Sequence, residues 1–182
     1  MPENFSNIKL NKDLSENSAV VTEDNLKDIQ AVIKLQEKNS ENVAVQSESF
    51  LADLYKKNLL RFGKNEEGEV IATLYLFPFP STHNGKPLFH LGGTVTLDDS
   101  IASKRALLKL LDAVVEDAST SKVIAGATAS SSFANYAKGK GFIEISFEDM
   151  SKTYPDIAKA YLESEFSNQY NFTDKNFYIL NA

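Results

Sequence analysis

The order of apolar and helical segments between residues 88 and 142 is the feature that most constrains the fold. An apolar run at 88–97 is followed by a loop of acidic and small residues at 98–103, a helical pattern at 104–118 and a second apolar run at 123–127. A strand, a loop, a helix and a strand in this order are typical of a βαβ unit, whose two strands lie parallel in one sheet. The loop before such a helix can present free backbone N–H groups to an anion.

The segments before residue 88 predict two helices and an antiparallel meander. Thr22 stands where the N-cap of the first helix should be, and two acidic residues follow it. Polar turns with glycine separate the strands, and the Asn84-Gly85 pair of the second turn suits positive φ angles. Together with the βαβ unit, the meander makes a mixed sheet of the α/β class. The predicted elements are a strand at 19–21, helices from Thr22 to Lys38 and from Ser47 or Ser49 to Asn58, and strands at 59–63, 70–77 and 88–97.

The chain of 182 residues is predicted to form one domain. Residues 1–18 are polar and lack a periodic pattern, so they form a flexible arm or contribute a short edge strand. The C-terminal part, residues 147–182, is predicted to add a helix at 155–167 and a terminal strand at 177–180. Its many aromatic residues can pack over the core, form a dimer contact or cover a substrate.

Composition and charge exclude several classes of function. Nineteen basic and twenty-five acidic residues give a net charge of −6, which disfavours nucleic acid as a partner. The chain has no cysteine and only two histidines, so disulfides and thiolate sites are excluded and no metal is expected. No apolar run approaches the roughly 20 residues needed to span a bilayer, and the N-terminus lacks the pattern of a signal peptide. We therefore expect a cytoplasmic protein without membrane partners.

The order and spacing of elements from about Ala19 to Ile145 resemble the GNAT (Gcn5-related N-acetyltransferase) family. That family has an antiparallel meander, a central helix, a parallel strand and a short helix ending in Gly-Phe, which here is Gly141-Phe142. The resemblance implies a GNAT-like fold and an acyltransferase. The enzyme would transfer an acyl group from acetyl-CoA or another acyl-CoA to a small-molecule or protein amine, by direct attack in a ternary complex. The alternative is a catalytically silent GNAT-like module that binds a ligand or a protein partner, and a homodimer is a further option.

The loop before the central helix departs from the family's pattern. In the family it reads Arg/Gln-x-x-Gly-x-Gly/Ala, and its backbone amides hold the pyrophosphate of acetyl-CoA. When Leu107-Leu108 is aligned with the family's leucine pair, Asp99 takes the arginine position. Ser100, Ala102 and Lys104 take the three small positions, so no glycine is present. The silent alternative depends on this loss.

The resemblance nevertheless implies a cofactor site around this loop. Lys104 and Arg105 stand in the first turn of the predicted helix, where a bound phosphate would offset their unfavourable interaction with the helix dipole. Gly92-Gly93 predicts a bulge in the preceding strand or a bend that curves the sheet. The predicted cofactor-binding residues are Val95, Thr96 and Leu97 along the pantetheine arm, Ser100, Ile101, Ala102, Ser103, Lys104 and Arg105 at the phosphates, and Asn135 at the cofactor amides.

Two side chains are candidates for proton transfer. In the family a tyrosine on the helix before Gly-Phe protonates the departing thiolate, and Tyr136 is the candidate here. Ala137 holds the family's usual position, and Tyr136 lies one residue before it. The alternative role of Tyr136 is therefore a structural one, in which its ring packs against neighbouring side chains. His90 is the candidate base because histidine titrates near neutrality, although a histidine within an apolar strand can be structural. Phe77-Pro78-Phe79-Pro80 can line the acceptor site or mark a strand end at which Pro78 stops pairing.

Overall fold

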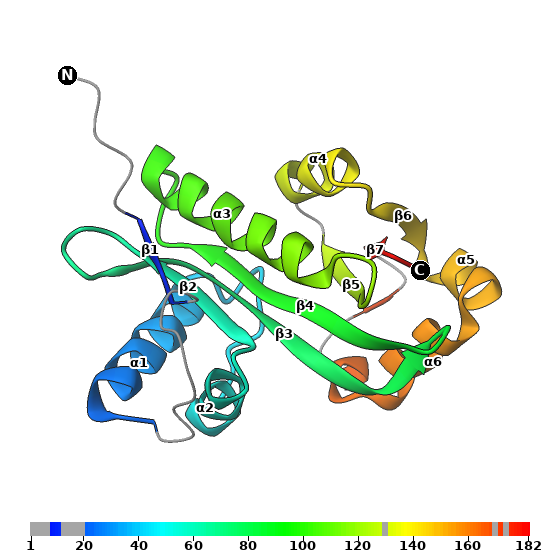
Figure 1. The fold of residues 1–182 in the computed structure, drawn as a ribbon, viewed down its shortest axis with the longest axis horizontal. Coiled ribbons are helices and arrows are strands. Elements are labelled where there is room, and N and C mark those ends of the chain that lie inside the picture. Colours follow the sequence, from blue (N-terminus) through cyan, green and yellow to red (C-terminus); the bar gives the residue numbers. More distant parts are fainter. Residues whose placement is uncertain (1–7, 12–20, 129–130, 169–170, 173–174) are drawn as a thin grey trace. The chain divides into compact units, whose positions relative to one another are not determined.

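The computed structural model describes residues 8–11, 21–128, 131–168, 171–172 and 175–182 (Figure 1). Two compact units can be distinguished: unit 1 contains residues 1–76 and 92–114, and unit 2 contains residues 77–91 and 115–182. The prediction of a single domain stays a prediction. The elements are β1 (Lys9–Leu10), α1 (Glu23–Lys38), α2 (Glu48–Lys56), β2 (Leu60–Lys64), β3 (Val70–His83), β4 (Lys86–Thr96), α3 (Ile101–Ala118), β5 (Val123–Thr128), α4 (Ser131–Gly139), β6 (Ile143–Ser146), α5 (Phe147–Thr153), α6 (Pro155–Glu163), η3 (Glu165–Asn168) and β7 (Asn176–Leu180).

The described strands form a mixed sheet, as the sequence predicts, and their order is β1-β2-β3-β4-β5-β7-β6. β1 and β2 are antiparallel, as are β2 and β3, whereas β4 and β5 are parallel. The prediction that β3 ends at Pro78 is wrong, because β3 continues to His83. The pairs that join β2 to β3 end at Leu60↔Tyr75, so a proline further along β3 removes no hydrogen bond from that ladder.

The N-terminal residues confirm one of the two predicted arrangements. Lys9 and Leu10 pair with β2 as a short edge strand, whereas residues 1–7 and 12–18 of the predicted arm lie outside the described residues. The strand predicted at 19–21 also lies outside them, except for Val21, which belongs to no strand.

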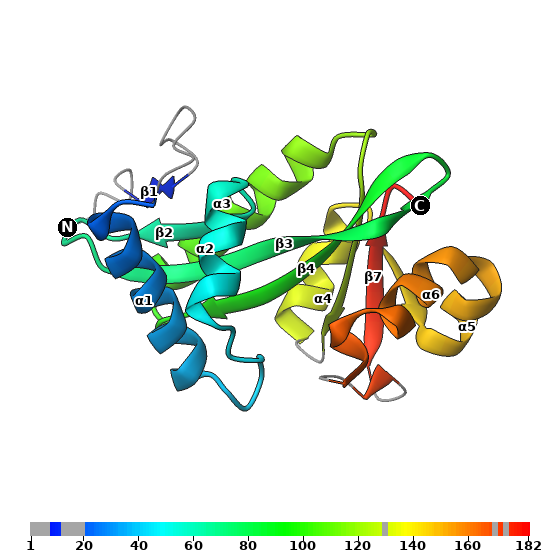
Figure 2. The same cartoon turned by 90° about the horizontal axis from the view of Figure 1, so that it is seen from below.

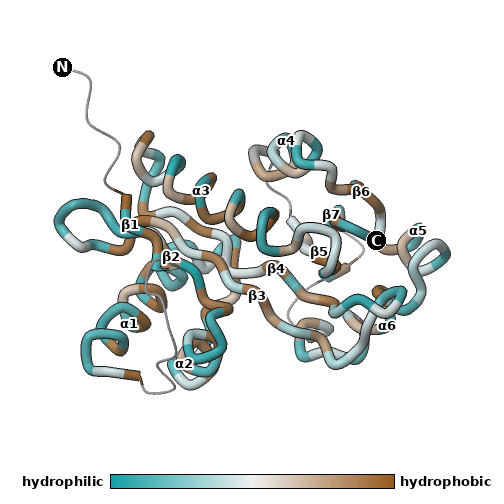
Figure 3. The backbone as a smooth tube through the Cα atoms, viewed as in Figure 1, coloured by the Kyte–Doolittle hydropathy of each residue, from teal (hydrophilic) through white to brown (hydrophobic). Residues whose placement is uncertain are grey.

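Unit 1 places α1 and α2 on one face of its strands and α3 on the other (Figures 1 and 2). Thr22 is the N-cap of α1, as predicted, and forms a capping box with Asn25. The Asn25 side-chain amide also donates to the Tyr55 hydroxyl of α2 at 2.8 Å, which ties the two helices together. Hydrophobic and hydrophilic residues alternate along α3 (Figure 3), and the hydrophobic side contributes Leu110, Leu111 and Val114 to the core.

A left-handed glycine interrupts β4 within unit 1. Gly93 has a φ of +60°, and the two arrangements predicted from Gly92-Gly93, a bulge and a bend, both stay predictions. A Cβ atom at Gly93 would lie 2.6 Å from two ring carbons of Tyr75 and 3.2 Å from the Gln36 side-chain nitrogen. Only glycine allows this close approach of the α1 and β3 side chains to the β4 backbone.

Unit 2 is built around β5, β7 and an aromatic cluster. Successive residues of β7 face opposite sides: Phe177 and Ile179 join the cluster with Tyr161 of α6, whereas the Tyr178 ring contacts Phe133 of α4. The helix predicted at 155–167 ends as α6 at Glu163, and η3 follows. α5 was not predicted, although its N-cap Ser146 accepts a hydrogen bond from the Asp149 N–H. None of the helices within the described ranges has the length and apolar content needed to cross a bilayer.

Candidate acyl-CoA site

The N-terminus of α3 is held by side chains of the preceding loop. The Ser103 N–H donates to the Ser100 hydroxyl at 3.2 Å and the Lys104 N–H donates to the Ser100 carbonyl at 3.1 Å, so Ser100 is the N-cap. α3 therefore begins at Ile101, three residues before the predicted start at Lys104. Asp98 extends the cap, because its Oδ1 accepts the Ser100 N–H at 3.1 Å and the Ser103 hydroxyl at 2.7 Å.

This loop already carries a negative charge at the helix N-terminus. Hydrogen bonds from Ser100 and Ser103 lower the pKa of Asp98 below its ordinary value, with a smaller contribution from the charge of Lys38. Lys104 Nζ lies 3.2 Å from Asp99, and the Asp99 side chain is 99% exposed. Exposed ion pairs of this kind are weak, so Lys104 can turn to another anion at little cost.

The loop could hold the phosphates of an acyl-CoA through part of the predicted set. The N–H groups of Ile101 and Ala102 belong to the first turn of α3, where backbone N–H groups have no acceptor within the helix. The small side chain of Ala102 leaves room for a phosphate to approach them closely. Lys104 and Arg105 are exposed on the same turn, whereas Ser103 is 1% exposed and uses its hydroxyl on Asp98. The predicted set therefore offers two amides and two cations, with two competing carboxylates, those of Asp98 and Asp99.

The segment predicted to bind the pantetheine arm already makes hydrogen bonds within the protein at Thr96 and Leu97. The Leu97 N–H donates to the Ile71 carbonyl at 2.9 Å, and the Leu97 carbonyl accepts from Lys38 Nζ at 2.8 Å. The Thr96 carbonyl accepts from the Asn39 side chain at 3.4 Å. Val95 lies in the strand with only 6% of its surface exposed. Cofactor contacts at Leu97 would therefore have to replace existing hydrogen bonds. The contact from Lys38 was missed, because a lysine 59 positions away leaves no local signal.

His90 lies in unit 2, where the β4–β5 ladder pairs it with Ala125. Its ring is 1% exposed, with the centroid 4.2 Å from that of Phe166 and Nδ1 3.0 Å from the Tyr161 hydroxyl. Burial lowers the pKa of His90 from 6.5 to about 3, so the ring is neutral at pH 7. A general base works best with a pKa near the operating pH, and His90 is far from it. The geometry favours the structural role over the catalytic one.

Tyr136 and Asn135 lie on α4, also in unit 2. Asn135 is exposed, and the half-buried Tyr136 ring has its centroid 6.4 Å from that of Phe133, with Lys140 Nζ 5.7 Å from it. Ala137 is fully buried, because one residue along a helix turns by about 100°. Tyr136 therefore has the partly open position that an acid facing a ligand needs. Within the described ranges, no group of three or more His, Cys, Asp or Glu residues could hold a metal ion.

The predicted site residues thus fall into two groups, one in each unit. Residues from Val95 to Arg105 lie together in unit 1, and His90, Asn135 and Tyr136 lie in unit 2. Tyr161, the partner of His90, was missed because it lies 71 positions away in the chain.

Comparisons with known proteins were made at the level of sequence and of structure. No protein-family model and no curated protein matches the sequence. Among solved structures, a Mycobacterium tuberculosis protein in complex with CoA has a TM-score of 0.59 at 15% identity, over 85% of this chain and 94% of that chain. A GNAT-family acetyltransferase from Staphylococcus aureus Mu50 has a TM-score of 0.55 at 15% identity, over 94% and 97% of the two chains. A ribosomal-protein-alanine N-acetyltransferase from Brucella melitensis has a TM-score of 0.53 at 14% identity, over 85% and 94%. The chain has the fold of the GNAT acetyltransferases.

Proposed function

We propose that this protein is an N-acyltransferase that transfers an acyl group from acetyl-CoA or another acyl-CoA to an amine. The observation that carries the proposal is the GNAT fold with a small-residue loop and an N-capped helix after the strand that contains the left-handed Gly93. One protein of similar fold was solved with CoA, and others of similar fold are acetyltransferases. The cytoplasmic location predicted from the sequence stays a prediction.

The loop and α3 are proposed to hold the acyl donor. Ile101 and Ala102 would donate backbone N–H groups to its phosphates, and Lys104 and Arg105 would supply positive charge. Acyl-CoA supplies a thioester. The neutral amine forms a C–N bond to its carbonyl carbon and loses a second proton from nitrogen to solvent water. The C–S bond breaks, and CoA leaves as the thiol after taking up a proton.

The residues of unit 2 are proposed to serve the proton transfers and the cofactor amides. Tyr136 would donate the proton that the thiolate takes up, and Asn135 would donate to a cofactor carbonyl. We assign His90 to the core, because a neutral buried ring gives little driving force for removing a proton from an ammonium. The amine would then lose its proton to solvent water.

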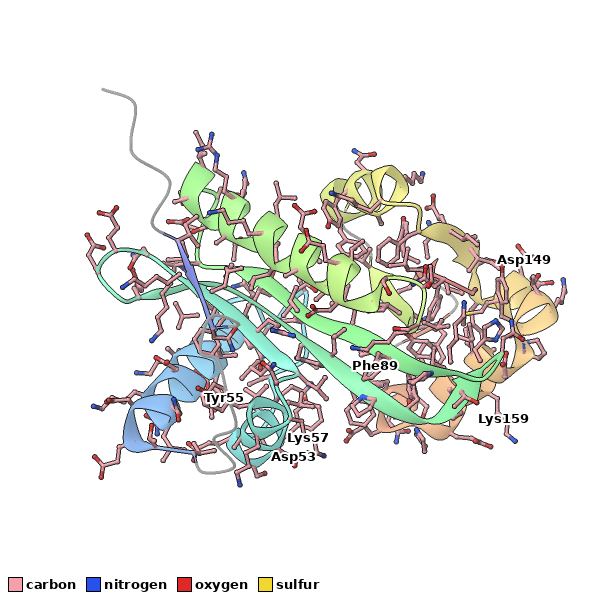
Figure 4. All side chains as sticks on the ribbon, viewed as in Figure 1. Asp53, Tyr55, Lys57, Phe89, Asp149 and Lys159 are labelled. Carbon is pink, nitrogen blue, oxygen red and sulfur yellow. The ribbon has the colours of Figure 1, made fainter. Side chains whose placement is uncertain are left out.

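Calorimetric titration with acetyl-CoA tests the donor site, with Asp98→Asn as the informative variant. Asparagine keeps an acceptor oxygen for Ser100 and Ser103 but removes the charge that a pyrophosphate would face. We expect wild type to bind, and the variant to bind roughly threefold to tenfold more tightly at low salt, with the difference shrinking as salt is added. Asp53→Asn makes the same charge change at the α2 ion pair with Lys57 (Figure 4) and should leave the dissociation constant unchanged.

Two results would count against the proposed function. If neither wild type nor Asp98→Asn binds acetyl-CoA at millimolar concentration, the donor site is rejected. If acetyl-CoA binds but no amine of a broad panel releases free thiol, the silent ligand-binding module becomes the better description. The Asp98 carboxylate at the α3 N-terminus is the observation that favours that second candidate.

Tyr136→Phe should lower kcat for thiol release by about tenfold to a hundredfold, because it removes the hydroxyl that protonates the thiolate. The KM for acetyl-CoA should stay near that of wild type. Tyr154→Phe, at a half-exposed tyrosine of unit 2, is the control and should retain full activity. An unchanged kcat in Tyr136→Phe would assign Tyr136 to packing.

A further inference from the structure

Unit 2 contains a half-open hollow between β3 and the end of α6. Its volume is about 260 Å³, which is the space of roughly nine waters at liquid density. Phe77, Phe79 and Pro80 line it from β3 together with Ser81, and Glu163 and Glu165 line it from the α6 end. None of its lining residues belongs to the donor loop or to the residues assigned to proton transfer.

The β3 side of the hollow is apolar and well supported. Phe77, Phe79 and Ser81 occupy alternate positions and therefore share one face of the strand. The two phenylalanine rings meet edge to face at a centroid distance of 6.1 Å, and Phe166 of η3 packs against both, at 5.2 and 6.2 Å. A hydrocarbon or aromatic ligand would meet preformed walls here, as small-molecule sites usually provide.

One polar atom within this apolar lining lacks a partner in the described part of the chain. The Ser81 hydroxyl oxygen is buried and makes no hydrogen bond there. A buried hydroxyl without a partner is costly in free energy, so native structures rarely keep one. A ligand with a hydrogen-bond donor or acceptor would supply the missing partner.

The α6 side of the hollow is negative. Glu163 is the last residue of α6, where the helix dipole also places negative partial charge, and Glu165 begins η3. Glu163 forms an exposed ion pair with Lys159 Nζ at 3.6 Å, and pairs of this kind are weak enough for a bound cation to replace (Figure 4). Glu165 forms no ion pair with any described residue. Aromatic walls beside two carboxylates suit an organic cation.

We propose that this hollow binds the amine substrate as its ammonium cation, and that the substrate is a compact primary amine on an apolar or aromatic body. The ammonium group would lie at Glu163 and Glu165, and the apolar body would lie against Phe77 and Phe79. The two carboxylates would repel acceptors that carry an anionic group near the amine. The assignment of the bound amine as the acyl acceptor rests on the proposed function, whereas its binding does not.

Calorimetry with phenethylamine, in the absence of acyl-CoA, tests this proposal. We expect phenethylamine to bind, the neutral isostere 2-phenylethanol to bind at least tenfold more weakly, and phenylacetate not to bind. The double variant Glu163→Gln/Glu165→Gln should weaken phenethylamine binding at least tenfold, and Ser81→Ala should weaken it a few-fold. Both glutamates are exposed, so the double variant should keep the wild-type melting temperature. Glu148→Gln, at an exposed ion pair on α5, is the matched control and should bind as wild type does.

The outcomes separate this proposal from the proposed function. Absence of phenethylamine binding at millimolar concentration, or equal affinity in the double variant and wild type, overturns the assignment of the hollow. If acetyl-CoA binds while phenethylamine does not, the acyltransferase proposal stands and the hollow has another role. If phenethylamine binds while acetyl-CoA does not, the hollow is an amine site and the acyltransferase proposal falls.

Discussion

Gly93→Ala is expected to lower the free energy of unfolding by about 2–5 kcal/mol. A left-handed backbone costs a residue with a Cβ roughly 1–2 kcal/mol, and overpacking a core adds about 1–3 kcal/mol. The overpacking arises because the new Cβ would lie 2.6 Å from two ring carbons of Tyr75. That ring cannot simply move away, because it is fully buried and meets Phe50 edge to face at 5.6 Å. Denaturant unfolding of both proteins measures the difference.

Gly68→Ala separates the backbone cost from the packing cost. Gly68 also has a positive φ, +83°, but a Cβ there would meet no atom within 4 Å. Its alanine variant should therefore lose only about 1 kcal/mol. An equal loss in the two variants would show that the contact with Tyr75 does not require glycine at position 93.

The features predicted correctly from the sequence are those that a few neighbouring residues determine. Thr22 caps α1 because its hydroxyl reaches an N–H three residues away, and such a contact depends on nothing distant. Asn84 and Gly85 both adopt positive φ angles for the same local reason. The order of strands and helices along the chain follows from the local hydrophobic pattern. The mixed sheet could therefore be predicted without knowing which distant segments touch.

The errors in the bounds of the elements have one cause far along the chain and two local causes. A proline such as Pro78 stops a strand only where its missing N–H would have paired, and the position of β2 decides that. The start of α3 at Ile101 depends on Ser100 and Asp98, whose acidic and small neighbours read as loop. α5 was missed because seven residues are too few for a clear helical period, although Ser146 and Asp149 provide a cap signal.

Predictions for site residues depended most on burial, which the sequence does not contain. His90 has an ordinary pKa as an isolated residue, and the sequence therefore allows it to act as a base. Its neighbours Tyr161 and Phe166 come from the C-terminal segment and exclude water from the ring. Burial of the ring excludes His90 as a general base, and it also makes the stability of the protein at low pH depend on His90.

Acidification should destabilise this protein through His90. Burial holds the pKa of His90 at about 3, whereas in the unfolded chain it is near 6.5. Between these values the unfolded chain binds the proton and the folded protein does not, so stability is complete above pH 6.5 and falls as the pH is lowered toward 3. From pH 6 to pH 4, His90 alone should remove roughly 2–3 kcal/mol from the free energy of unfolding.

His90→Asn tests this dependence, since asparagine does not titrate and keeps a side-chain amide near the Tyr161 hydroxyl. The variant should be less stable than wild type at pH 7, because the ring packed against Phe166 is lost. Its further loss between pH 6 and pH 4 should nevertheless be smaller than that of wild type by roughly 2–3 kcal/mol. NMR of the wild-type His90 ring gives an independent reading, with chemical shifts that stay constant from pH 8 to pH 4.5. Titration of the ring near pH 6.5, with equal acid losses in the two proteins, would mean that water reaches His90, and its role as general base would return.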